Sequence, residues 1–492
     1  MLCDFYQPAS STVTDKHYRF LFCVPTTQLS GGVKVIFALT DRLVEAGHEV
    51  DLFSYANAPE WYNQKARLVQ AKDLSNVDMT RYDFVVVSNA VFIPMVLPLL
   101  GSARCVFLAQ DYESFHHATD TTYESFLAES PAFKALYSLP VPIISISRPI
   151  ARLIQDRIGK TAYYLPVGLD KNVFRRQAHV TSGDLKRVLL VGNYLMPYKG
   201  MRDGLDALES LSSDIPVELV LITQEERGRK LFDSYSFPKE VHFCPAETDV
   251  PGIIASCDAY CCTSWYEGLG LPALESFCCG TPVVSTRTLG VDDYAEDGKN
   301  LLLANPNDPD DLRDKLHRLL TDSALADRLV RGGFETMDGR YEWEISLAAF
   351  MSAITDIDTT YSGSGELDVP LLERMLEELE REGSLTPIET YREFHRLDQE
   401  LSRVADELAE DVPVNGQIHD LTAIRDDLKQ YVTNSRTQYY SAFKAKYDLC
   451  LLLIELAGSP DRVHIRRLLH PQRGATAGTN ATALTEVRYT QP

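Results

Sequence analysis

The chain lacks the patterns that indicate a secreted, membrane-spanning or nucleic-acid-binding protein. Its ten cysteines form no Cys-x-x-Cys pair and have no regular spacing, which argues against a zinc site. The adjacent pairs Cys261-Cys262 and Cys278-Cys279 fall where a buried strand and helix are expected, so we expect them to be small, buried, reduced side chains. A formal net charge of −22 argues against a nucleic-acid partner and against a uniformly basic membrane face. The best apolar run, residues 91–101, is too short to span a bilayer and contains two prolines. No basic start precedes an apolar run, so we expect no signal peptide and a cytoplasmic location, at most peripheral at the inner membrane face.

Apolar runs that alternate with helical patterns occupy most of the chain. In the first half they lie at 18–26, 49–55, 82–90, 103–110 and 142–148. In the second half they lie at 187–193, 217–223, 241–245, 258–264, 281–286 and 300–304. Strands that are apolar throughout and alternate with helices predict parallel sheets covered on both faces. We therefore predict an α/β protein with two Rossmann-like domains facing a cleft, in which ligands bind at the carboxyl ends of the strands.

The most informative segment is 264–286, which carries two carboxylates and a glycine turn. Glu267 and Glu275 are separated by seven residues, and Gly268 and Gly270 permit a tight turn between them. A proline then suits the first turn of a helix that contains Glu275. The start of a helix after a glycine turn favours anions, because its free N–H groups and its dipole both attract phosphate. The segment therefore predicts a site that binds a phosphorylated ligand and several hydroxyl groups.

This segment resembles the E-x7-E signature of retaining glycosyltransferases with the GT-B fold, specifically family four (glycosyl transferases group 1). The resemblance extends over about residues 18–357. It implies that Glu267 lies beside the donor sugar as a catalytic residue and that Glu275 binds the ribose of the sugar nucleotide. It also implies a donor-binding segment made of Gly268, Leu269, Gly270 and Leu271.

Further donor contacts follow from the same resemblance. Gly31 and Gly32, in an expected glycine loop at 28–32, would approach the donor phosphates or the acceptor. Lys199 matches the family's phosphate lysine, which neutralises charge on the departing diphosphate and acts in catalysis. Asn193 stands in the donor site where the family usually has an arginine, and the nearby Arg202 is a possible substitute.

A second departure from the family follows the strand at 103–110. Many members have a histidine where this chain has Gln110-Asp111, and the local sequence Ala-Gln-Asp-Tyr-Glu resembles that of bacterial rhamnosyltransferases. Asp111 is a candidate catalytic residue that orients or deprotonates an acceptor hydroxyl, and capping of the next helix is an equally good interpretation. The acidic pairs Asp292-Asp293 and Asp310-Asp311 are not expected to hold a metal.

The resemblance and the composition together predict five segments. These are an acceptor domain at 1–178, a sugar-nucleotide domain at 179–340, a crossover helix at 341–357, a helical extension at 366–460 and a disordered tail at 473–492. The extension is charged with an apolar periodicity, which is typical of self-association or partner docking.

The predicted activity is transfer of a sugar from a nucleoside-diphosphate sugar to a hydroxyl of a glycan, lipid or protein, in surface glycan synthesis. The sugar nucleotide is a substrate, and no cofactor or metal is expected. Two alternatives stay open: a sugar-nucleotide epimerase of the same fold, and a non-catalytic scaffold that assembles partners through the helical extension.

Overall fold

A computed structural model of the chain describes residues 16–361 and Arg374, apart from residues 28, 55, 57, 60, 70–73, 116–122, 124–130, 178–183, 195, 225–231 and 233. All of these residues belong to one compact unit, Met1–Leu385. The predicted helical extension, except for Arg374, and the predicted tail lie outside the described residues. Among the residues that are described, no helix combines the length and apolar character that a bilayer crossing requires.

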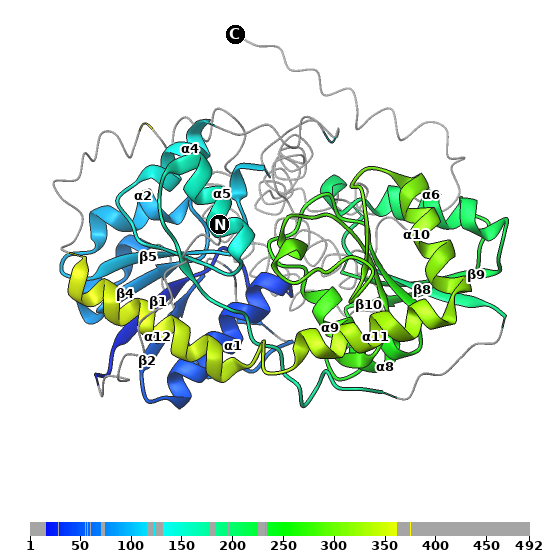
Figure 1. The fold of residues 1–492 in the computed structure, drawn as a ribbon. Coiled ribbons are helices and arrows are strands. Elements are labelled where there is room, and N and C mark those ends of the chain that lie inside the picture. Colours follow the sequence, from blue (N-terminus) through cyan, green and yellow to red (C-terminus); the bar gives the residue numbers. More distant parts are fainter. Residues whose placement is uncertain are drawn as a thin grey trace, which may run out of the picture. The chain divides into compact units, whose positions relative to one another are not determined.

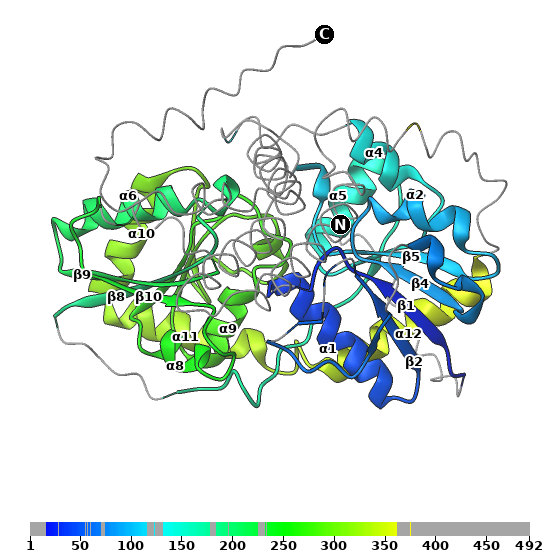
Figure 2. The same cartoon turned by 180° about the vertical axis from the view of Figure 1, so that it is seen from behind.

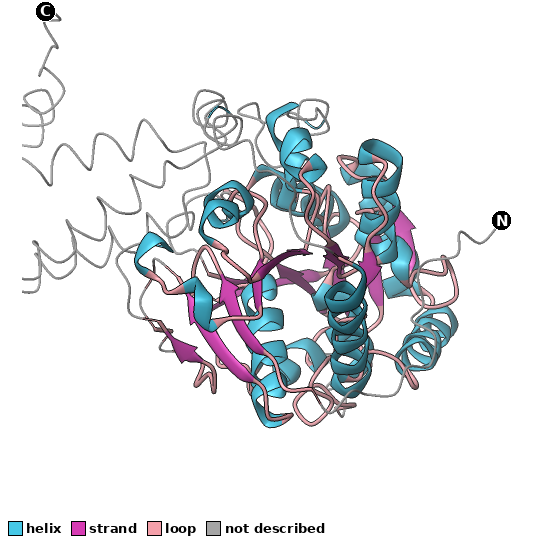
Figure 3. Ribbon diagram, turned by 90° about the vertical axis from the view of Figure 1, so that its left-hand side faces the viewer, coloured by secondary structure: helices cyan, strands magenta, loops and turns pink. Residues whose placement is uncertain are grey.

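The first domain is built on a parallel sheet with the strand order β3-β2-β1-β4-β5-β6-β7 in its described part (Figure 1). Its strands are β1 (Arg19–Cys23), β2 (Glu49–Phe53), β3 (Arg67–Leu68), β4 (Phe84–Val87), β5 (Arg104–Ala109), β6 (Ile143–Ser145) and β7 (Tyr163–Tyr164). The helices around it are α1 (Gly31–Glu45), α2 (Phe92–Val96), α4 (Pro131–Ser138) and α5 (Arg148–Ile158). Helices cover both faces of the strands (Figure 3), which explains why β1, β4 and β5 are apolar at nearly every position.

The second domain repeats this plan, with the strand order β10-β9-β8-β11-β12-β13 among its described residues. Its strands are β8 (Lys186–Val191), β9 (Val217–Thr223), β10 (Lys239–Phe243), β11 (Ala259–Cys262), β12 (Val283–Thr286) and β13 (Leu302–Ala304). Its helices are α6 (Met201–Ser212), α8 (Val250–Ala255), α9 (Leu271–Cys279), α10 (Pro309–Thr321) and α11 (Ser323–Met337). In both sheets the order reverses beside the first strand, between β1 and β4 and between β8 and β11. Such reversal points are where doubly wound sheets bind ligands.

A last helix, α12 (Trp343–Thr360), returns the chain to the first domain. It lies against α1, as Figures 1 and 2 show from opposite sides. The Phe350 ring packs between the β1 side chains Phe20 and Phe22, with ring centroids 5.9 and 6.1 Å away. The helix therefore completes the core of a domain from which it is distant in sequence, and it ends at Thr360 rather than at the expected 357.

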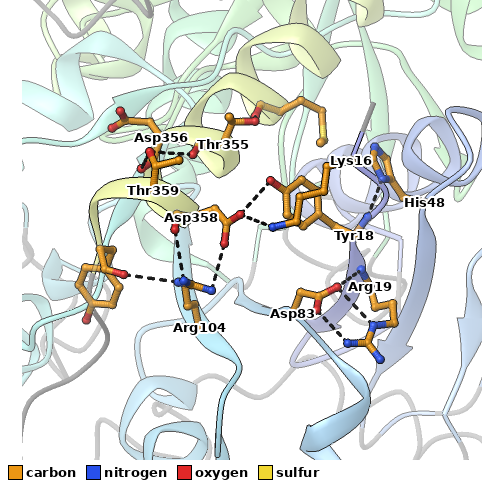
Figure 4. Close-up of polar contacts among 12 residues, drawn as sticks. Lys16, Tyr18, Arg19, His48, Asp83, Arg104, Thr355, Asp356, Asp358 and Thr359 are labelled. Atoms are coloured by element: carbon orange, nitrogen blue, oxygen red, sulfur yellow. Dashed lines mark hydrogen bonds and ion pairs between the residues drawn. The ribbon is translucent and has the colours of Figure 1, made fainter. Parts of the chain in front are cut away.

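The end of α12 is fixed to the first domain by a carboxylate with several partners (Figure 4). One oxygen of Asp358 lies 2.5 Å from Lys16 Nζ and accepts a hydrogen bond from the Tyr18 hydroxyl at 3.2 Å. The other oxygen lies 3.1 Å from Arg104 Nη1. Because Asp358 gathers partners from before β1 and from β5, it fixes the direction in which the chain leaves α12.

One local expectation is corrected by the structure. Gly31 and Gly32 belong to the first turn of α1 and not to a loop. Ser30 is the reason, because its side chain caps the helix by accepting a hydrogen bond from Val33 N at 3.2 Å. The two glycines therefore present a helix N-terminus, and not a flexible loop, at the end of β1.

Candidate functional site

The centre of the candidate site is an ion pair at the reversal point of the second sheet. Lys199 follows β8, Glu267 follows β11, and Lys199 Nζ donates to Glu267 Oε1 at 2.7 Å. The same carboxylate oxygen accepts from the Ser264 hydroxyl at 2.6 Å. The Lys199 and Glu267 side chains are 23% and 20% exposed, so both charges are largely removed from water. Burial lowers the pKa of Lys199, but the charge and hydrogen bond of Glu267 together with the nearby Tyr198 raise that pKa above its usual value. The lysine is therefore held as a cation.

Three contacts place Lys199 against the end of β11. The Thr263 hydroxyl donates to the Lys199 carbonyl at 2.7 Å, and Trp265 N donates to the Tyr198 carbonyl at 2.7 Å. Gly200, at φ +56°, permits the approach, because a Cβ on it would lie 1.9 Å from the Thr263 carbonyl oxygen. The position of the lysine is thus set by the backbone of two neighbouring segments.

The glycine turn after Glu267 leads directly into α9. Gly270 precedes the helix at φ +84°, which favours glycine, and its carbonyl accepts from the Tyr294 hydroxyl at 3.2 Å. Leu269 is buried and Leu271 is the first residue of α9. Gly268 lies against the first domain, because a Cβ on it would be 1.9 Å from the Gln110 carbonyl oxygen. The N-terminus of α9 therefore follows Glu267 closely in the chain, and its dipole favours an anion there.

Glu275 is the fifth residue of α9, at the start of its second turn, among charges from both domains. Burial raises the pKa of Glu275 to about 7, although the charge of Lys34 lowers it. Lys34, on α1, lies 3.2 Å from Glu247 Oε1, and Glu247 raises the Glu275 pKa further. A Cβ on Gly31 would lie 3.6 Å from Leu271 Cδ1, so the N-termini of α1 and α9 also approach each other.

The residues after β5 meet this group from the first domain. Gln110 Nε2 donates to the Gly32 carbonyl at 3.1 Å, which joins the end of β5 to the start of α1. Asp111 is half-buried. The pKa of Tyr266, the residue before Glu267, is raised first by the burial of Tyr266 and next by the charge of Asp111. Both residues of the departure from the family pattern at 110–111 therefore lie where the two domains meet.

The other candidates have different surroundings. Asn193 is buried after β8, and its carbonyl accepts from Met196 N at 3.1 Å. Arg202 is exposed on α6, and its charge acts on Asp203, whose carboxylate accepts from Trp265 Nε1 at 2.7 Å. The arginine therefore lies near the segment that carries Glu267, while its own guanidinium faces solvent.

The two acidic pairs considered in the sequence have structural partners. Asp293 is fully buried and accepts from Arg148 N at 2.9 Å and from the Tyr164 hydroxyl at 3.2 Å, whereas Asp292 pairs with Arg287 at 2.6 Å. In the pair Asp310-Asp311, both residues lie in the first turn of α10. Within the described residues, no group of three or more His, Cys, Asp or Glu side chains is placed to hold a metal.

Cysteine burial agrees with the sequence-based expectation. The adjacent pairs Cys261-Cys262 and Cys278-Cys279 are buried and free, in β11 and α9 respectively. Burial raises the pKa of each of these thiols, so they serve as small apolar side chains.

Three residues around the site were missed by sequence reasoning. Ser264 shares the Glu267 oxygen with Lys199, Lys34 brings a charge from α1 toward Glu275, and Tyr266 contacts the first domain. The spacing of Ser264 and Glu267 across the turn could have indicated the first of these contacts. The other two join distant segments, and no local sequence signal marks them.

Solved structures with the same arrangement of two sheets define the fold class. A sucrose-phosphate synthase from Thermosynechococcus elongatus is similar with a TM-score of 0.58 at 15% identity, over 69% of this chain and 99% of that one. Anabaena HepE in complex with UDP-glucose gives 0.57 at 14% identity, over 69% and 100% of the two chains. The predicted GT-B fold, with two Rossmann-like domains, is therefore confirmed.

The sequence comparisons agree with the predicted family. Residues 174–336 match the family described as glycosyl transferases group 1, which confirms the predicted resemblance over this part of the chain. An MMP alpha-(1->4)-mannosyltransferase of Mycolicibacterium hassiacum is 30% identical over 39% of this chain and 47% of its own length. The lipopolysaccharide core biosynthesis glycosyltransferase LpsE of Rhizobium meliloti is 29% identical over 35% and 51%. The chain spans about half the length of the curated relatives that it matches.

Proposed function

We propose that this protein is a retaining glycosyltransferase that moves a sugar from a nucleoside-diphosphate sugar to a hydroxyl of a glycan, lipid or protein. The observation that carries the proposal is the Lys199–Glu267 pair at 2.7 Å, immediately before a glycine turn and a helix N-terminus. A cation, a helix N-terminus and a carboxylate are groups that suit a sugar diphosphate. The family match at residues 174–336 covers all three.

In the proposed reaction the bond between the anomeric carbon and the diphosphate breaks as the acceptor oxygen attacks from the same face. Lys199 and the positive end of the α9 dipole neutralise the negative charge that develops on the departing diphosphate. Glu267 lies beside the sugar and stabilises the positive charge at the anomeric carbon. Glu275 accepts hydrogen bonds from the ribose, and Asp111 orients or deprotonates the acceptor hydroxyl.

The names of the relatives support a role in surface glycan or glycolipid synthesis. They include a lipopolysaccharide core glycosyltransferase and a phosphatidyl-myo-inositol mannosyltransferase, the latter 25% identical over 44% of this chain. We extend this role to the present chain as part of the proposal, together with a cytoplasmic or peripheral membrane location and self-association through the C-terminal residues. The likeness to GT-B enzymes is the reason for expecting no metal requirement.

The test has two stages. A panel of sugar nucleotides is first screened by thermal shift, because a ligand that binds only the native state raises the melting temperature. The stabilising donor is then incubated with candidate acceptors, and nucleoside diphosphate release and the anomeric configuration of the product are measured. Glu267→Gln is the control, since it keeps the shape of the side chain and removes its charge.

Each outcome separates the proposal from its alternatives. Release that depends on an acceptor, with retained configuration and loss in Glu267→Gln, supports the transferase. Interconversion of donor sugars without an acceptor would indicate an epimerase. No donor binding and no release across the panel would favour the scaffold.

A further inference from the structure

Tyr266 is the side chain that connects the Glu267 loop of the second domain with the first domain. Its phenol oxygen accepts a hydrogen bond from the backbone N–H of Tyr112, in the segment after β5, at 2.5 Å. Its ring meets Phe115 edge-on, with the centroids 5.5 Å apart. Tyr266 is 3% exposed and Tyr112 is fully buried, so this hydrogen bond forms away from water.

The same segment is held from the opposite side by its own domain. The Tyr137 hydroxyl donates to the Asp111 carbonyl at 3.1 Å and accepts from Glu113 N at 3.2 Å. The buried Glu113 carboxylate accepts from Ala90 N at 3.0 Å. The backbone at 111–113 is therefore fixed by one tyrosine from each domain.

The Tyr266–Tyr112 hydrogen bond lies one residue away from each of the two candidate carboxylates, Asp111 and Glu267. Tyr266 directly precedes Glu267, and Tyr112 directly follows Asp111. Because Asp111 and Glu267 belong to different domains, a shift of one domain against the other would change their separation. We propose that Tyr266 is a positioning residue that sets Asp111, on the acceptor side, in register with Glu267, on the donor side. This inference depends on the proposed glycosyl transfer for its catalytic meaning, but not for the contact itself.

The proposal gives a specific role to the phenol oxygen. In Tyr266→Phe the ring keeps its packing on Phe115, while the buried Tyr112 N–H loses this acceptor, which favours a shift of the backbone that carries Asp111. Lys199 and Glu275, which are proposed to bind the donor, lie in the second domain and are unaffected. Turnover with the acceptor should therefore change without a change in donor binding.

The experiment compares Tyr266→Phe with Tyr82→Phe. Tyr82 is a suitable control because it is also buried and its hydroxyl donates to Asp51 at 2.7 Å, within the first domain and away from the site. We expect Tyr266→Phe to lower kcat by about ten- to a hundredfold, the scale of a misplacement near 1 Å, with the donor KM within about twofold of wild type. Tyr82→Phe should keep kcat within about twofold. Tyr137→Phe, which loosens the same segment from its other side, should reproduce the fall in kcat.

Two readings would overturn the proposal. One is a wild-type kcat in Tyr266→Phe, or a fall in kcat matched by Tyr82→Phe or accompanied by an equal loss of donor affinity. The other does not depend on activity and uses amide hydrogen exchange at Tyr112. The proposal predicts that this exchange accelerates in Tyr266→Phe and stays slow in Tyr82→Phe. Unchanged exchange at Tyr112 in Tyr266→Phe would refute the positioning role of Tyr266, whether or not the protein transfers sugar. If the wild-type protein transfers no sugar but the exchange accelerates, the proposed function fails and the contact stands.

Discussion

Separate removal of Lys199 and of the Glu267 charge is the most direct test of the candidate site. We expect Lys199→Ala and Glu267→Gln each to lower kcat by about 10²-fold or more, the scale of losing one preorganised electrostatic group. At about 1.36 kcal/mol for each factor of ten, this corresponds to about 2.7 kcal/mol of transition-state stabilisation. The side chains are only about a fifth exposed and 2.7 Å apart, so water cannot replace either partner fully.

The two variants should differ in their dependence on pH. In the wild type, Glu267 raises the pKa of Lys199 while burial lowers it. Glu267→Gln removes the charge that contributes most to raising it, so Lys199 should lose its proton at a lower pH. The residual activity of Glu267→Gln should therefore decline at a lower alkaline pH than that of wild type. Lys199→Ala leaves Glu267 with the Ser264 hydroxyl as a donor and should show no such shift.

Initial rates of nucleoside diphosphate release, with donor and acceptor varied separately, measure these effects. The double variant should be little worse than either single variant, because groups that act as a unit are not additive. Lys65→Ala is a matched control, since Lys65 pairs with Glu45 in a surface contact whose side chains are about half exposed. A folded variant of Lys199 or Glu267 with a kcat near that of wild type would remove that residue from the catalytic set.

Three more predictions follow from the structure. Glu275→Ala should weaken donor binding in calorimetry by about 1.5–3 kcal/mol, the range for a hydrogen bond to a charged group. Because the pKa of Glu275 is raised to about 7, the donor affinity of the wild type should fall as pH drops below about 7. The donor affinity of Glu275→Gln should not depend on pH around 7. Gly268→Ala should lower both kcat and the melting temperature, because its Cβ would lie 1.9 Å from the Gln110 carbonyl oxygen, whereas Gly252→Ala, with no atom within 4 Å of its Cβ in α8, should lower neither. Truncation after Tyr361 should keep the donor affinity and reduce the mass measured by light scattering, and a full-length chain that scatters as a monomer would contradict self-association.

Much of the fold was predictable because the apolar pattern determines it locally. Each apolar run that was predicted as a strand overlaps a strand, and the glycine turn before α9 lies where Gly268, Gly270 and the following proline place it. The two-residue strands β3 and β7 carry too little pattern to be predicted with their pairing. Gly31 and Gly32 were assigned to a loop because glycine usually ends a helix, whereas here the Ser30 cap outweighs their low helix propensity.

The contacts that give the site its electrostatics were less accessible from sequence. Glu267 and Lys199 were both candidates, but the 2.7 Å ion pair between them depends on the strand order, which brings β8 beside β11. The raised pKa of Glu275 results from burial and from Glu247, and the charge of Lys34 from the other domain opposes it. Tertiary distance, and not residue type, determines these properties.

The return of α12 also has a consequence for the order in which the protein is made. β1 leaves the ribosome early, but Phe350, which covers Phe20 and Phe22, is translated only after the whole second domain. During that interval the nascent first domain exposes aromatic surface that normally lies in its core, which is a condition for aggregation or chaperone capture. A fragment that stops before α12 should keep this aromatic surface exposed and should therefore aggregate more readily than the full chain. A circular permutant that places residues 343–361 ahead of β1 should remove it, because each domain would then be complete as it emerges.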